Sequence, residues 1–152
     1  FAAAEYLAKK KGWDVSETLN YLNKKCGMAG VSGVSSDFRD LTAAEEEGNA
    51  RAKLALDMFS YACKKYVGAY AAAMNGVDCV VFTAGVGEHT PYVREAICSD
   101  MQYLGMEIDH DKNYEDVRGN VRDISGKNSK VKILIIPTNE ELVIARETVE
   151  LL

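Results

Sequence analysis

The chain has 152 residues, 47% of them hydrophobic, so it has the usual size of one domain and can bury a core. Its net charge of -5 and the absence of a basic run argue against nucleic acid as a partner. No stretch approaches the roughly 20 apolar residues of a membrane helix, and the N-terminal charges follow the apolar run, unlike a secretory signal. We therefore expect a soluble, cytoplasmic protein with no membrane partner.

The four cysteines are scattered and form no C-x-x-C pair, which argues against a zinc site and a disulfide framework. They are expected to be reduced thiols of the core: Cys26, Cys63, Cys79 and Cys98. The two histidines, His89 and His110, are too few and too isolated for a histidine metal cluster. Any metal should therefore be held by oxygen.

The first part of the chain has a helical pattern. It is interrupted at Lys11-Gly12, and Ser16-Glu17 should open a second short helix that ends near Lys25. Residues 27–40 contain three glycines and no helical period, so they are predicted to form a loop with a short extended stretch, which could include a strand near residues 30–34.

A long helix is predicted next. Thr42 and Glu45 have the spacing of a capping box, and the helix should run to about Asn75, with Gly48-Asn49 as a potential break. Spacings of three and four predict its buried face, which comprises Leu54, Met58, Ala62, Tyr66, Ala69 and Ala73.

The rest of the chain alternates strand and helix. Residues 79–82 and 131–136 are short, apolar and β-branched, as in strands covered on both faces. A helix should begin at Pro91, with one buried face made of Val93, Ile97, Met101 and Leu104. Residues 109–130 are polar and form a surface excursion of undefined structure, and a last helix should span residues 140–151. This order predicts α/β architecture, in which ligands bind beyond the carboxyl ends of the strands.

The loop after the first strand, residues 83–90, could accept a phosphate. Gly85 and Gly87 would let the main chain approach a ligand, and the helix at Pro91 would direct its free amides toward the loop. A plain tight turn explains the two glycines equally well. The dinucleotide fingerprint G-x-G-x-x-G is not met, because Thr90 stands at the third glycine position, so a Rossmann fold is disfavoured.

The loop after the second strand carries two carboxylates. Thr138 and Glu141 have capping-box spacing, which gives Glu141 a structural role. Glu140 then remains free to serve as the oxygen ligand that Mg²⁺ uses beside substrate phosphates. Alternatively, both acids simply complement the dipole of the last helix.

A third candidate is the segment Asp37, Phe38 and Arg39. It is either a polar loop with Phe38 anchored in the core and Arg39 paired with Asp37, or a clamp around the base and ribose of a nucleotide. Spacing alone does not choose between the two.

Taken together, three blocks resemble the acetate kinase family in the family's order. They are LNKKCGMAGVSGVSSDFRDL (residues 22–41), KKYVGAYAAAMNGVDCVVFTAGVGEHTPYVRE (residues 64–95) and IPTNEELVIARET (residues 136–148). The resemblance implies a ribonuclease H-like domain of the acetate and sugar kinase, Hsp70 and actin superfamily. It also implies transfer of a phosphoryl group between ATP and acetate, with ATP or ADP and Mg²⁺ as cofactors, and a homodimer.

The resemblance also implies site residues. The adenosine region is assigned to Asp37, Phe38 and Arg39, and Mg²⁺ to Glu140. The loop that binds adenosine and the first phosphate is assigned to Gly85, Val86, Gly87, Glu88 and His89. His89 departs from the family pattern, which usually has Asn there.

Family members are much longer than this chain, so residues 1–152 are expected to be the C-terminal, nucleotide-binding part of such an enzyme. The N-terminal domain, with the carboxylate site and the cations that act on the phosphoryl group, would be absent, and no catalytic residue is assigned here. Two alternatives remain open: a propionate kinase of the same family, and a non-catalytic nucleotide-binding or dimerisation module.

Overall fold

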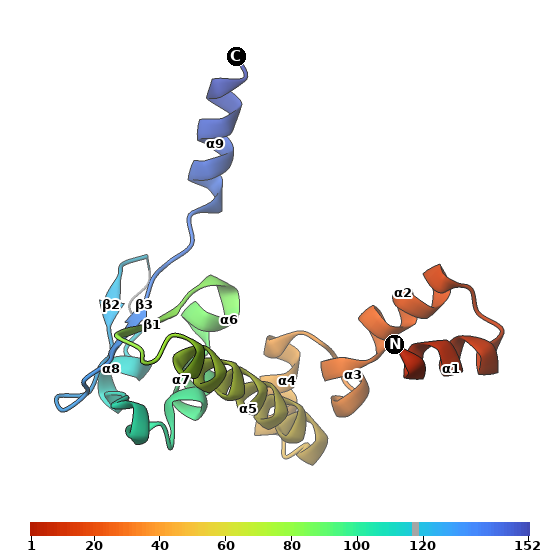
Figure 1. The fold of residues 1–152 in the computed structure, drawn as a ribbon, viewed down its shortest axis with the longest axis horizontal. Coiled ribbons are helices and arrows are strands. Elements are labelled where there is room, and N and C mark those ends of the chain that lie inside the picture. Colours follow the sequence, from red (N-terminus) through yellow and green to blue (C-terminus); the bar gives the residue numbers. More distant parts are fainter. Residues whose placement is uncertain (117–118) are drawn as a thin grey trace. The chain divides into compact units, whose positions relative to one another are not determined.

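The computed structural model describes residues 1–116 and 119–152 and divides into two compact units, Phe1–Phe59 and Ser60–Leu152 (Figure 1). The first unit is helical, and the second contains a small sheet with helices. Among the described residues, none of the helices combines the length and apolar character needed to cross a bilayer.

Two helices open the first unit, α1 (Ala2–Lys11) and α2 (Val15–Lys25), as predicted. Gly12 ends α1 in a left-handed conformation with φ 69°, which glycine adopts without strain. The α2 helix begins one residue before the predicted Ser16-Glu17 start. Its N-cap is Asp14, whose carboxylate accepts from the main-chain N–H of Glu17 at 2.8 Å, while the Glu17 carboxylate accepts from the N–H of Asp14 at 2.9 Å.

The next two helices correct the prediction for residues 27–42. Residues expected in a loop and strand form α3 (Gly27–Ser32), and α4 (Phe38–Glu46) begins before Thr42. Asp37 caps α4, because its carboxylate accepts from the N–H of Arg39 at 2.9 Å. Thr42 lies inside the helix, where its hydroxyl donates to the carbonyl of Phe38 at 2.7 Å, so the predicted cap at Thr42 is wrong.

The long helix α5 (Ala50–Ala73) follows a break at Gly48-Asn49, as predicted. Gly48 has φ 88°, and the Asn49 side chain accepts from the main-chain N–H groups of Arg51 and Ala52, which cap the new helix.

The predicted buried face of α5 is wrong. Leu54 and Met58 are each 51% exposed, and Tyr66 is 64% exposed. The buried side is formed mostly of small residues: Ala52, Ala55, Leu56, Ser60 and Ala71. Because apolar residues occur on more than one side of this helix, spacing alone did not identify the side with the small side chains.

The second unit contains a three-stranded mixed sheet in the order β1-β3-β2. The predicted strands are confirmed as β1 (Cys79–Phe82) and β3 (Lys132–Ile135), which pair in parallel with Phe82 opposite Ile135. The third strand, β2 (Arg122–Asp123), pairs antiparallel with β3 and lies inside the stretch expected to be a surface excursion. In this sheet β1 is an edge strand with Val81 46% exposed, so it is not covered on both faces as expected.

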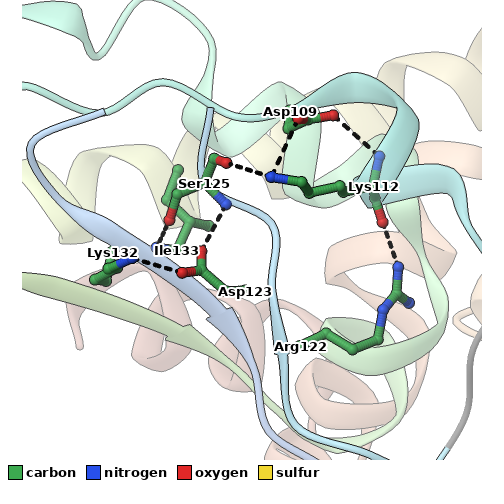
Figure 2. Close-up of polar contacts among 7 residues, drawn as sticks. All are labelled: Asp109, Lys112, Arg122, Asp123, Ser125, Lys132 and Ile133. Atoms are coloured by element: carbon green, nitrogen blue, oxygen red, sulfur yellow. Dashed lines mark hydrogen bonds and ion pairs between the residues drawn. The ribbon is translucent and has the colours of Figure 1, made fainter. Parts of the chain in front are cut away.

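Hydrogen bonds fix this excursion to β3 (Figure 2). Asp123 accepts from the ammonium of Lys132 at 2.7 Å and from the N–H of Ser125 at 2.9 Å. The Ser125 hydroxyl in turn accepts from the N–H of Ile133 at 2.8 Å, and the Ser125 carbonyl accepts from Lys112 at 3.3 Å. Hydrogen bonds of polar side chains thus hold this segment in place, although its sequence has no hydrophobic period.

The remaining helices are α6 (Ala84–His89), α7 (Pro91–Cys98), the 3-10 helix η1 (Gln102–Leu104), α8 (His110–Tyr114) and α9 (Glu140–Glu150). Pro91 occupies the first turn of α7, as predicted. Val93, Ile97 and Met101 are buried as predicted, whereas Leu104 is half-buried. They share the core of this unit with Met106, Ile124, Val131, Ile133 and Ile135. Every residue of α9 is exposed.

The four cysteines are free thiols, but only Cys98 lies in the core. Cys79 is exposed at the start of β1, and the other two are half-buried. Burial raises the pKa of Cys98 to about 12, so this thiol stays protonated and inert at neutral pH.

Candidate functional site

The loops that follow β1 and β3 meet around one cavity of about 470 Å³. Because the two strands are parallel and in register, their carboxyl ends lie side by side, as the rule for ligand sites in such sheets requires. The lining residues come from both loops: Ala84, Gly85, Glu88, His89, Thr138, Asn139, Glu140 and Glu141. The two candidate loops of the second unit are therefore brought together.

The first wall of the cavity is helix α6, which occupies a segment expected to be an irregular loop. Its first residue, Ala84, has φ 59°, a left-handed conformation that is uncommon for a residue with a side chain. This conformation lets the chain reverse from β1 directly into α6. Strained backbone of this kind is often kept at functional sites.

The two glycines of this wall differ in their surroundings. A Cβ atom on Gly85 would meet nothing within 4 Å, so the main chain there is open to a ligand. A Cβ atom on Gly87 would lie 3.2 Å from the carbonyl carbon of Phe82, tighter than ordinary packing. Gly87 therefore allows α6 to pack on the end of β1, whereas Gly85 borders the cavity.

A carboxylate joins the two walls. One oxygen of Glu88 accepts from the main-chain N–H of Thr138 at 2.9 Å and from its hydroxyl at 3.0 Å. The N–H of Thr138 holds the pKa of Glu88 below its ordinary value. The ionised carboxylate thus fixes the loop after β3 against α6.

The start of α9 corrects the predicted capping box. Thr138 is bound to Glu88, and the N-cap is Asn139, whose side-chain oxygen accepts from the N–H of Leu142 at 3.1 Å. Glu140 and Glu141 are both exposed residues of the first turn, and both line the cavity. The capping argument that distinguished Glu140 from Glu141 is therefore wrong.

The oxygen donors of the cavity suit a hard cation that shares its ligands with a phosphate. Among residues 1–116 and 119–152, no three His, Cys, Asp or Glu side chains gather as a metal cage. Mg²⁺ does not need one, because it binds through one or two carboxylates together with phosphate oxygens and water. Glu140 and Glu141 offer two such carboxylates.

In the first unit, the segment of Asp37, Phe38 and Arg39 has local partners. The Arg39 guanidinium donates to both carboxylate oxygens of Asp37, at 3.0 and 2.6 Å, and lowers the pKa of Asp37 to about 2. The Phe38 ring packs edge-on against Phe59, with ring centres 4.8 Å apart. These contacts are those of the paired and anchored alternative, and the Arg39 side chain is 89% exposed.

One buried residue beside the site was not predicted from the sequence. Arg94, on α7, is 2% exposed and donates to the carbonyls of Gly87 and Glu88, each at 2.9 Å. The sequence did offer one signal for its burial: Arg94 directly follows Val93, which belongs to the predicted buried face of α7. A buried arginine needs several acceptors, and these were not visible in the sequence.

The sequence profile of the acetokinase family matches residues 1–146. The chain belongs to this family. The family resemblance predicted from the three sequence blocks is thereby confirmed.

Curated and solved relatives agree with the acetokinase assignment. An acetate kinase of Caldicellulosiruptor saccharolyticus is 55% identical over 147 residues, which are 97% of this chain and 37% of that protein. The crystal structure of Porphyromonas gingivalis acetate kinase is similar with a TM-score of 0.88 and 46% identity, over 98% of this chain and 37% of that one. The crystal structure of a propionate kinase from Francisella tularensis subsp. tularensis is similar with a TM-score of 0.82 and 38% identity, over 96% and 36%.

The chain thus spans little more than a third of the length of these acetokinase-family relatives. The predicted α/β fold is confirmed by the acetate kinase structures it resembles.

Proposed function

We propose that the gene product containing this sequence is an acetate kinase, which transfers a phosphoryl group reversibly between ATP and acetate to give ADP and acetyl phosphate. The described part would supply the binding of ATP or ADP and Mg²⁺. One observation carries this proposal: α6 and the residues around Thr138 form a single cavity at the carboxyl ends of two parallel strands in a member of the acetokinase family.

The nucleotide is proposed to lie along the main chain of residues 85–89. Gly85 supports this because its Cα faces open space, so no side chain blocks the approach of a phosphate or ribose. His89 lines the same cavity and can donate a hydrogen bond, as the amide usual in the family does. Asp37, Phe38 and Arg39 are proposed to contact the adenosine, on the basis of the family resemblance.

Glu140 is proposed to hold Mg²⁺, with Glu141 beside it as the alternative ligand. When bound, Mg²⁺ neutralises phosphate charge and orients the phosphate chain. The protein's part is to present a carboxylate at the cavity, which the first turn of α9 does.

Phosphoryl transfer depends mainly on positioning and on positive charge around the transferred group. Within residues 1–116 and 119–152, the side chains that line the cavity include no lysine or arginine. We therefore propose no catalytic residue in the described part. The cations and the acetate site would lie in the part of the relatives' length that this chain does not span.

The protein is further proposed to be a cytoplasmic homodimer. Apolar side chains exposed on α9 support association, since Val143 is 52% and Ile144 64% exposed.

Propionate is the alternative acceptor, because a propionate kinase structure shares this fold at 38% identity. The test is formation of acyl phosphate by the gene product with Mg²⁺ and ATP, using acetate and propionate in parallel. Acetate should give the higher kcat/KM. A higher value with propionate would favour the alternative, and no product with either acid would refute the kinase proposal.

A further inference from the structure

Arg94 is the largest side chain of the described residues that is fully buried. No ion pair to it is found among the described residues, and the acceptors that it binds are neutral carbonyl and amide oxygens. Burial lowers the pKa of Arg94 to about 10, which leaves the guanidinium charged at neutral pH. A buried cation is costly unless its donors are satisfied.

Four hydrogen bonds satisfy this guanidinium. Nη1 donates to the carbonyls of Gly87 and Glu88, each at 2.9 Å. Nε donates to the side-chain oxygen of Asn113 at 2.7 Å, and Nη2 donates to the Asn113 carbonyl at 2.7 Å. Arg94 thereby connects α6 with α8.

The bonds to α6 reach its last turn. The final carbonyls of a helix have no partner within the helix, and a positive charge near them is favourable. Since α6 ends at His89, the carbonyls of Gly87 and Glu88 are among these groups. A planar fork of donors can hold both carbonyls at once, which a lysine ammonium in the same place would do less well.

Glu88 connects the hydrogen bonds of Arg94 with the candidate site. Its carbonyl is held by Arg94, while its carboxylate holds Thr138 on the opposite wall of the cavity. Arg94 itself is not among the residues that line the cavity. Its influence on a ligand there would therefore be indirect, through α6, rather than by contact.

We propose that Arg94 is a positioning residue of the nucleotide site: its guanidinium fixes the last turn of α6 and, through Glu88, the position of Thr138 and the start of α9. This inference rests on the proposed function. It assigns no contact with substrate to Arg94.

The test compares Arg94→Lys and Arg94→Met in the full-length gene product, with Lys132→Met as the control. Lys132 is a cation of the same unit, and its exposed ammonium binds the Asp123 carboxylate at 2.7 Å. Both Arg94 variants should raise the KM for MgATP by about tenfold or more, as misplaced binding groups do, while the KM for acetate changes less than about twofold. Lys132→Met should leave both KM values unchanged.

Hydrogen exchange provides a second measurement that needs no activity. In Arg94→Lys, amides of residues 84–90 should exchange faster, whereas those of β3 should exchange as in the wild type. A wild type without kinase activity would refute the proposed function, and the exchange rates would still decide the role of Arg94.

Several results would overturn the proposal. These are a wild-type KM for MgATP in Arg94→Lys, an equal rise in the KM values of nucleotide and acetate, or unchanged exchange of residues 84–90. If neither Arg94 variant folds, Asn113→Ala takes their place, because it removes the Nε acceptor and leaves Arg94 present. It should raise the KM for MgATP in the same direction but less, and an unchanged KM would contradict the proposal.

Discussion

Glu88 and Thr138, which lie 50 positions apart, are joined by two hydrogen bonds to one carboxylate oxygen. The first residue belongs to the helix after β1 and the second to the loop after β3. These bonds therefore join the two walls of the cavity, which belong to segments that the sheet brings together.

The first prediction concerns pH. The pKa of Glu88 is lowered, so the link should stabilise the fold above the ordinary pKa of 4.5 and be lost as pH falls through the lower folded value. Glu88→Gln removes this ionisation but keeps an acceptor. The difference in Tm between wild type and variant should be constant at neutral pH and shrink under acid conditions. Because the link is partly exposed, it should contribute less than about 1 kcal/mol. A difference that grows in acid would contradict the assignment.

The second prediction separates the two glycines. Gly87→Ala should lower the free energy of unfolding by about 1 kcal/mol or more, because its Cβ would press on the Phe82 main chain. Gly85→Ala has free space and should fold like the wild type. Gly85→Val should also fold but bind ADP far more weakly, because its side chain would project into open space beside the cavity. Thermal melting and calorimetry measure the two effects. Equal destabilisation by the two alanine variants would contradict this division.

The third prediction concerns the paired acids. Both open α9 and neither closes a capping box, so Glu140→Gln and Glu141→Gln should each cost a similar small amount of stability, about 0.3–1 kcal/mol. Glu140→Gln alone should raise the Mg²⁺ concentration needed for half-maximal activity. Initial rates over a Mg²⁺ series test this. An equal Mg²⁺ requirement for the two variants would refute a special role for Glu140.

The fourth prediction is a histidine titration outside the site. His110 Nδ1 lies 2.9 Å from a carboxylate oxygen of Glu95, and this hydrogen bond raises the pKa of His110 above 6.5. The interaction should stabilise the protein below pH 6.5 and be lost as pH rises through the higher folded value. NMR of labelled histidine should show the raised midpoint, and Glu95→Gln should lower it toward the ordinary value, with Asp109 and Asp111 still raising it. A midpoint unaffected by Glu95→Gln would be inconsistent with the pair.

The fifth prediction is that residues 1–152 expressed alone self-associate. In the described sheet β1 has an open edge with Val81 exposed, and α9 exposes Val143 and Ile144. Light scattering should show a dimer or larger species. A stable monomer that binds ADP with full affinity would contradict this prediction.

Much of the fold could be predicted because strong local signals agreed. Short β-branched runs indicated the strands β1 and β3, and Pro91 indicated the start of α7; in each case no other local signal pointed to a different element. The failures arose where two local signals competed. Asp37 and Thr42 are both acceptable caps, and only Asp37 precedes its helix. The buried side of α5 also depends on which side chains are small enough for close packing, which spacing does not report.

The site followed a similar pattern. Parallel strands made it predictable that the loops containing Gly85 and Glu140 would meet. The bond between Glu88 and Thr138 was not predictable, because Thr138 also had a plausible local partner in Glu141. The hydrogen bonds that Arg94 makes were not predictable either. They depend on the position of α8, which lies in a stretch of sequence without a hydrophobic period.

The most direct test of the account is calorimetric titration of MgADP into the full-length gene product and its folded Gly85→Val variant. The wild type should bind MgADP saturably at one site per chain, and Gly85→Val should lose this binding while its Tm stays unchanged. Unaltered MgADP affinity in the folded variant would show that the nucleotide does not lie in the cavity between α6 and α9.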